Sequence, residues 1–113
     1  MQLKNDECGW NNLKDTILNH YNKIGMPINF SGSSREEGWL FHYYLIDKKH
    51  VIQYGIGEDR HVMLGGLALG IGPRYFRPSE FWDYENSERF SMEASTEAVE
   101  KNLNLLDEFL GKR

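Results

Sequence analysis

The stretch that decides the fold is "WLFHYYLIDKKHVIQYGI", residues 39–56. Two runs rich in aromatic and β-branched residues, 39–46 and 50–56, flank the short polar sequence "DKK". Runs of this composition on either side of a tight polar turn are typical of a β-hairpin. The sequence therefore predicts two antiparallel strands that are joined at residues 47–49.

The register of this hairpin follows from the side chains that it would bring together. If Asp47 pairs with His50, the large apolar residues of both strands fall on one face, whereas a slip of one residue scatters them. We expect this face to cover the core. The predicted pairs are Phe41 with Ile56, Tyr43 with Tyr54, and Leu45 with Ile52.

A third strand is predicted in "RHVMLGGLAL", residues 60–69, after a turn at "GED", residues 57–59. Pairing of Val62 with Tyr54 would continue the apolar face of the hairpin. The three strands then form an antiparallel meander in which each strand pairs with the next one along the chain.

The predicted register leaves a second, more polar face. His42, Gly55 and His61 form one cross-strand row on it. The spacing of neighbouring strands places the two histidines about 10 Å apart at the backbone, so that a ligand over Gly55 would contact both. This row predicts an alternative ligand face formed by His42 and His61.

Apolar residues recur at helical spacing on both sides of the strands. The first helix is predicted over residues 11–23, with Asp6 or Asn11 as its cap. The last helix is predicted to follow a cap at Ser95 or Thr96, and its apolar stripe is expected to cover the sheet.

The remaining segments complete the predicted architecture. Residues 29–38 are polar and rich in Ser and Gly, which predicts a loop, and residues 88–93 alternate in polarity, which predicts a fourth, edge strand. We therefore expect a single α+β domain over residues 1–113. Its mostly antiparallel sheet of three to four strands, a meander, packs against an N-terminal and a C-terminal helix.

The chain of 113 residues has a formal net charge of −4, and the excess negative charge lies in its last third. Residues 79–113 carry four positive and nine negative groups. A field of this sign repels nucleic acid and anionic membranes and attracts basic partners. The single cysteine excludes an internal disulfide, and the N-terminal residues lack the apolar core of a signal peptide. These features predict a cytoplasmic protein with no nucleic-acid or membrane partner.

Sequence motifs for catalysis are missing. Cys8 has no base at a diagnostic spacing, and the four histidines lack the spacing of a metal site. The glycine-rich segment 65–74 ends in Gly-Pro-Arg, whereas a phosphate-binding loop ends in Gly-Lys-Ser/Thr. The sequence therefore predicts no enzyme, no metal and no cofactor.

The segment "SEFWDYENSERF", residues 79–90, combines four aromatic rings with four carboxylates. Aromatic residues are enriched at protein interfaces, and carboxylates around them steer and orient a basic partner. A competing interpretation places Phe81, Trp82 and Phe90 in the core and leaves only the charges outside. The predicted partner-binding residues are Glu80, Trp82, Asp83, Tyr84, Glu85 and Glu88.

Three stretches of the chain resemble small bacterial immunity proteins. They are "WNNLKDTILNHYNKIG" (10–25), the hairpin at 39–56, and "STEAVEKNLNLLDEFLGK" (95–112). The resemblance is one of layout: a helix, an antiparallel meander and a second helix. Such proteins protect a cell from toxins delivered by its neighbours, including those of contact-dependent growth inhibition. The resemblance implies a non-enzymatic cytoplasmic protein that binds one toxin domain tightly and blocks its active site.

The acidic segment further implies that the toxin domain is basic, as the surface of a nuclease is. We expect the protein itself to be a monomer or a weak dimer. Two other functions stay open on the sequence. A small-molecule-binding domain or small enzyme would use the face with His42 and His61, and a deep pocket over Gly55 would support it. A subunit of a larger assembly would dock through the acidic face.

Overall fold

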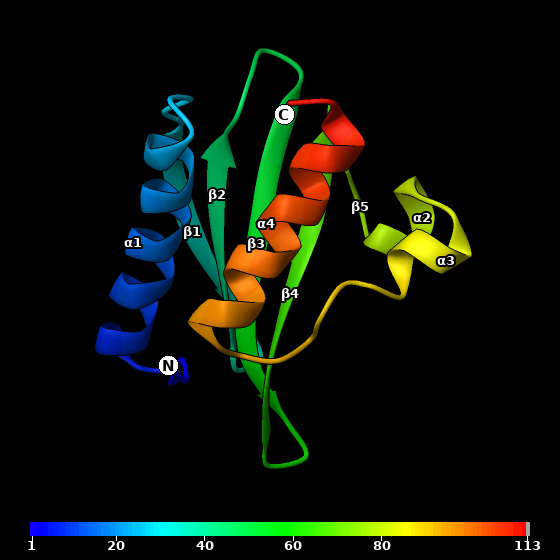
Figure 1. Ribbon diagram of the computed structural model, residues 1–113. Helices are drawn as coiled ribbons and strands as arrows, with labels where there is room; N and C mark the ends of the chain where they lie inside the picture. Colours follow the sequence, from blue (N-terminus) through cyan, green and yellow to red (C-terminus); the bar gives the residue numbers. More distant parts are fainter. Residues whose placement is uncertain (113) are drawn as a thin grey trace.

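The computed structural model describes residues 1–112 and has a mixed α+β fold (Figure 1). An antiparallel sheet with the strand order β1-β2-β3-β4-β5 packs against an N-terminal and a C-terminal helix. This confirms the predicted fold class, although the sheet has five strands rather than three to four. The strands are β1 (Asn29–Glu36), β2 (Trp39–Leu45), β3 (His50–Asp59), β4 (Val62–Ile71) and β5 (Arg74–Phe76). The helices are α1 (Glu7–Lys23), α2 (Pro78–Phe81), α3 (Tyr84–Ser87) and α4 (Thr96–Leu110).

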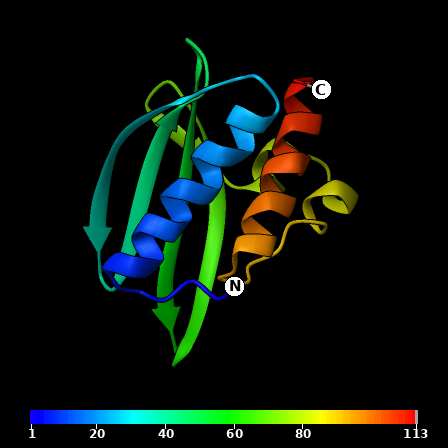
Figure 2. The same ribbon diagram turned by 60° about the vertical axis from the view of Figure 1, so that its left-hand side comes forward.

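The two long helices, α1 and α4, lie side by side on one face of the sheet, as Figures 1 and 2 show from two directions. The short helices α2 and α3 lie beyond the β4–β5 edge (Figure 1). None of the helices in the described part of the chain is both long enough and apolar enough to span a membrane.

Both long helices begin at a side chain that caps them. The Asp6 carboxylate accepts the Gly9 N–H at 2.8 Å, so α1 begins four residues before its predicted start. The Ser95 hydroxyl accepts the Ala98 N–H at 3.1 Å. Gly111, in the left-handed conformation, ends α4 as its position after the apolar stripe suggests.

The core lies between the sheet and the two long helices. Both helices and the three central strands contribute to it, and each fully buried large apolar side chain contributes about 1.5–3 kcal/mol. The largest fully buried side chains are Tyr21, Tyr44, Tyr54, Leu3, Leu13, Ile17, Ile52, Ile56, Leu69, Leu103, Leu106 and Val99.

The β2–β3 register differs from the predicted one by one residue: Phe41 lies opposite Gly55 rather than Ile56. The even-numbered side chains of β2 therefore face the helices, and its odd-numbered rings face away from them. Apolar composition does not separate the two registers, because β2 is apolar on both faces. The register in the structure instead places large rings on glycines, with Phe41 over Gly55 and Trp39 over Gly57.

The β3–β4 hairpin is longer than predicted. Residues 57–59, predicted as its turn, belong to β3, and the turn consists of Arg60 and His61. Both turn residues have positive φ, the geometry that matches the twist of antiparallel strands. Tyr54 consequently lies opposite Leu67, five residues further along β4 than predicted.

Two edge segments also differ from their prediction. Residues 29–36, predicted as part of a loop, form strand β1, whose mostly exposed polar side chains suit an edge position. Residues 88–93 are not a strand, and an isolated bridge between Leu64 and Glu93 is the pairing there. Strand β5 occupies the edge beside the end of β4 instead.

Candidate protein-binding surface

The acidic segment forms the two short helices α2 and α3, and its own carboxylates begin both of them. The Glu80 carboxylate accepts the Arg77 N–H at 2.9 Å, and the Asp83 carboxylate accepts the Asn86 N–H at 2.9 Å. Such bonds satisfy N–H groups that a helix start leaves without partners. Two of the predicted partner-binding residues therefore also hold the local fold.

Glu80, Asp83, Glu85 and Glu88 are all exposed, and we call them the acidic patch. Hydrogen bonds from the backbone N–H and the side-chain amide of Asn86 hold the pKa of Asp83 below its ordinary value, so this group stays charged at neutral pH. Within residues 1–112, the side chains of Glu85 and Glu88 have no hydrogen-bond or ion-pair partner. A basic partner can approach these two carboxylates without displacing an existing contact.

Two of the four rings in the segment, Phe81 and Trp82, pack against Phe109 on α4, and a third, Phe90, packs against these two. The rings of Phe81 and Trp82 lie 4.9 and 5.3 Å from that of Phe109, and Phe90 lies 6.1 Å from Phe81. Tyr84 alone among the four is largely exposed, at 78%. The predicted binding residue Trp82 is therefore half-buried and supports the segment, whereas the ring of Tyr84 faces solvent.

The buried side-chain amide of Asn102 links the end of the acidic segment to the core by hydrogen bonds. The Asn102 side chain, on α4, accepts the Ser91 N–H at 2.9 Å and donates to the Ser91 carbonyl at 2.8 Å and to the Tyr54 hydroxyl at 2.9 Å. Arg89 also reaches α4, through an ion pair with Glu108 at 3.2 Å. The acidic patch is thus held on a support that is linked to both the sheet and α4.

The sheet face that points away from α1 and α4, here called the open face, carries aromatic rings. Trp39 and Phe41 stack with their ring centroids 6.0 Å apart, and Tyr43 meets Tyr75 edge-on at 5.8 Å. All four rings are at least partly accessible to solvent. Aromatic side chains in such positions offer large, rigid contact areas to a partner.

A groove of about 490 Å³ runs between these rings and the acidic segment. Trp39 and Phe41 line it on the open face, where Gly66 and Ala68 form part of its floor. On the other side it is lined by residues of the acidic segment, including Glu88. The groove therefore extends from the rings of Trp39 and Phe41 on the open face to the acidic patch.

The predicted row of His42, Gly55 and His61 is wrong. His42 lies on the core face, where it is 5% exposed and its Nδ1 lies 3.0 Å from the Tyr44 hydroxyl. His61 lies in the β3–β4 turn, with its side chain 99% exposed. Because the register is shifted by one residue, Gly55 lines the groove on the open face while His42 lies beneath the helices.

Burial, and secondarily the charge of Lys14, lower the pKa of His42 from 6.5 to about 4. As the pH falls, the unfolded chain takes up this proton before the folded chain does. The free energy of unfolding is therefore fully retained above pH 6.5 and declines as the pH falls from 6.5 towards 4. Since one pKa unit corresponds to about 1.4 kcal/mol, His42 should lower the stability by about 2 kcal/mol between pH 7 and pH 5.

Replacing His42 by asparagine should remove this contribution, because the amide keeps a polar atom near the position of Nδ1 and does not titrate. We expect the free energy of unfolding of His42→Asn, from urea denaturation, to change by about 2 kcal/mol less than that of the wild type between pH 7 and pH 5. The exposed His61→Asn should keep the wild-type pH dependence. An unchanged dependence in His42→Asn would show that this histidine is not the group responsible.

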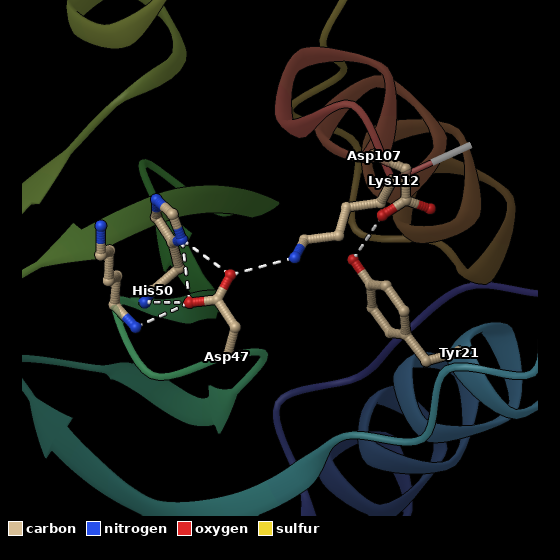
Figure 3. Close-up of polar contacts among 6 residues, drawn as sticks. Tyr21, Asp47, His50, Asp107 and Lys112 are labelled. Atoms are coloured by element: carbon tan, nitrogen blue, oxygen red, sulfur yellow. Dashed lines mark hydrogen bonds and ion pairs between the residues drawn. The ribbon is translucent and has the colours of Figure 1, made fainter.

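Two further polar clusters tie elements together (Figure 3). The Asp47 carboxylate contacts the His50 ring at 2.9 Å and the Lys112 ammonium group at 3.1 Å, and the Tyr21 hydroxyl donates to Asp107 at 2.9 Å. Partial burial raises the pKa of Asp47, but hydrogen bonds, including those from His50 and Lys112, outweigh burial and place this pKa well below its ordinary range. In the part of the chain that the structure describes, no group of three or more His, Cys, Asp or Glu side chains is placed to hold a metal ion.

Sequence reasoning considered a pocket over Gly55, but it missed this groove between the rings of Trp39 and Phe41 and the acidic segment. Its signal is the alternation of Gly55 and Gly57 in one strand opposite Phe41 and Trp39 in the strand before it. A ring fits over a glycine because no Cβ occupies that space. Matching large residues to glycines, instead of large residues to one another, would have given the correct register.

Comparisons of the chain with protein-family models, with curated proteins and with solved structures find no match. The function is therefore inferred from the residues and the geometry of this chain.

Proposed function

We propose that this protein is an immunity-type binding protein that neutralises a cognate basic toxin domain, such as a nuclease domain, by covering its active site. The observation that carries the proposal is the acidic patch, whose four carboxylates are exposed on two consecutive short helices. A surface that binds nucleic acid carries the complementary positive charge. The proposed protein is non-enzymatic, acts in the cytoplasm and does not itself bind nucleic acid or membranes.

The geometry supports both fast association and high affinity in such binding. The unpaired carboxylates of Glu85 and Glu88 give a negative field that accelerates and orients the approach of a basic surface. Tyr84, the residue before Glu85, supplies an exposed ring, and aromatic anchors of this kind contribute strongly to interface energy. Carboxylates seated where phosphates bind exclude the nucleic-acid substrate by occupying its site.

The proposal predicts protection of cells by this chain. A toxin domain, which the proposal expects to be encoded by a neighbouring gene, is produced in cells with or without this protein, and growth is measured. We expect the wild-type chain to restore growth and the double variant Glu85→Lys, Glu88→Lys to lose protection, because four units of charge change on the patch. Among residues 1–112 these two carboxylates have no hydrogen-bond or ion-pair partner, so the variant should retain its stability.

The double variant Asp15→Lys, Glu36→Lys is the matched control, because it changes the net charge equally on α1 and β1. It should protect as the wild type does. Equal protection by the patch variant and the control would remove the acidic patch from the interface. A folded wild-type chain that does not restore growth in the presence of the toxic domain would count against the immunity function itself.

A small-molecule-binding domain or small enzyme is the second candidate, and the groove over Gly55 favours it. Its volume of about 490 Å³ lies within the range of ligand sites. The charged side chains in its lining are Arg77 and Glu88. This candidate would use the groove on the open face instead of His42 and His61.

A further inference from the structure

Gly66 holds the floor of the groove open although the fold does not require a glycine there. At Gly55, Gly57 and Gly70 an added Cβ would lie 2.3 to 2.7 Å from the ring that covers each glycine. At Gly66, which lies on the same face, an added Cβ would meet no atom within 4 Å. Gly66 is also not among the residues with positive φ, so its backbone conformation does not require a glycine.

A glycine inside a strand lowers stability, because it loses more chain entropy on folding and packs nothing. The rings over the other three glycines explain their presence, whereas the space above Gly66 is empty. We propose that Gly66 keeps the groove open for a large apolar or aromatic side chain of the basic partner. This inference rests on the proposed function and names the second part of its interface.

The lining of the groove favours a side chain with a cationic neighbour. Trp39 and Phe41 provide apolar walls that accept a ring or a long aliphatic chain. Arg77 lines the groove beside α2, and Glu88 lines it beside α3. The neighbouring cation of the partner therefore belongs on the α3 side, where Glu88 leads on to Glu85 and the rest of the acidic patch.

The edge of β4 favours insertion of a side chain over addition of a strand. Gly65 donates its N–H to the Met92 carbonyl at 2.9 Å, and Leu69 lies opposite Phe76 in β5, so the edge is already covered at both ends. The interval between them, residues 66–68, is shorter than the roughly five to six residues of an ordinary strand. A partner segment can therefore place a side chain on the floor of the groove, but the free edge of β4 is too short for it to pair as an added strand.

The variants Gly66→Leu and Gly66→Ala test the role of the groove in binding independently of the acidic patch. Leucine fills the space above the floor, whereas alanine leaves most of it open, and both variants keep all four carboxylates. Since neither side chain meets a neighbour at its Cβ, both variants should unfold at urea concentrations equal to or above that of the wild type.

The probe is a synthetic pentapeptide with a central phenylalanine flanked by two lysines on each side. Binding is followed by the backbone amide signals of Gln53, Gly66 and Ala68 in ¹⁵N–¹H correlation spectra. We expect these signals to shift with the wild type and with Gly66→Ala. In Gly66→Leu, or with an alanine at the centre of the peptide, affinity should fall by about tenfold or more.

Flanking glutamates in place of lysines should also weaken binding, because Glu88 then repels the peptide. Signal shifts confined to α2 and α3, or equal affinity of Gly66→Leu, would overturn the role of the groove while leaving the acidic patch as the interface. Equal binding of the glutamate-flanked peptide would overturn the assignment of the groove to a basic partner. Loss of protection in Glu85→Lys, Glu88→Lys tests the proposed function separately.

Discussion

Replacing Asp107 by alanine should lower the free energy of unfolding by about 3–5 kcal/mol. The Asp107 carboxylate on α4 is fully buried and lies 2.8 Å from Nε2 of His20. It also accepts the Tyr21 hydroxyl at 2.9 Å (Figure 3). Both partners belong to α1, so this one side chain joins the two long helices inside the core. Its removal leaves a buried imidazole and a buried hydroxyl without their carboxylate.

Asparagine at this position provides the control, because it keeps an oxygen for the Tyr21 hydroxyl and nearly the same volume. Asp107→Asn should therefore lose less stability than Asp107→Ala. Urea denaturation followed by circular dichroism measures both losses. A loss below about 1 kcal/mol for Asp107→Ala would mean that water replaces the carboxylate and that the contact does not stabilise the helix pair.

Replacing Asn102 by alanine should cost about 2–4 kcal/mol and should also loosen the acidic segment. The Asn102 side chain is 1% exposed, and its three hydrogen bonds connect Ser91 and Tyr54 to α4. The backbone N–H and carbonyl of Ser91 lose their partner at the same time. Amide hydrogen exchange should consequently become faster in residues 84–91 than in β3.

Asn19 supplies the matched control for an Asn-to-Ala change, since its side chain is exposed and it lies on the other long helix, α1. Asn19→Ala should leave hydrogen exchange in the acidic segment unchanged. If Asn102→Ala lowered stability while exchange in residues 84–91 stayed at the wild-type rate, the segment would owe its position to the rings around Phe109 instead.

The two long helices could be predicted from the sequence because their determinants are local. Apolar residues at helical spacing give each of these helices its buried stripe. Their ends are set by residues close by in the sequence: the caps Asp6 and Ser95, and Gly111 after α4. The remaining error concerned α1, for which two candidate caps were available. Asp6 is the residue that forms the bond, because its carboxylate reaches the Gly9 N–H.

The sheet was harder to predict because its register depends on residues that are far apart in the sequence. Strand β2 is apolar on both faces, so the number of apolar residues on a face did not decide which side covers the core. The close approach of Trp39 to Gly57 and of Phe41 to Gly55 decides it. One slipped residue was sufficient to place His42 in a ligand row that does not exist.

The acidic segment was located correctly by composition, but its side chains divide in a way that composition cannot show. Carboxylates stay at the surface because burial of an unpaired charge is unfavourable. Aromatic rings pack against the nearest apolar surface. Here that surface includes Phe109 on α4, which is distant in sequence from Phe81. Tyr84 is therefore the exposed ring of the predicted set, and Trp82 is not.

The most direct test of the central claim is the dissociation constant for the toxin domain that the proposal expects a neighbouring gene to encode, measured by calorimetry at low and at high salt. For the wild type we predict an affinity that falls with added salt. For Glu85→Lys, Glu88→Lys we predict an affinity lower by about 10- to 100-fold at low salt, with a weaker salt dependence. A wild-type affinity that the two substitutions leave unchanged, with the same salt dependence, would contradict binding through the acidic patch.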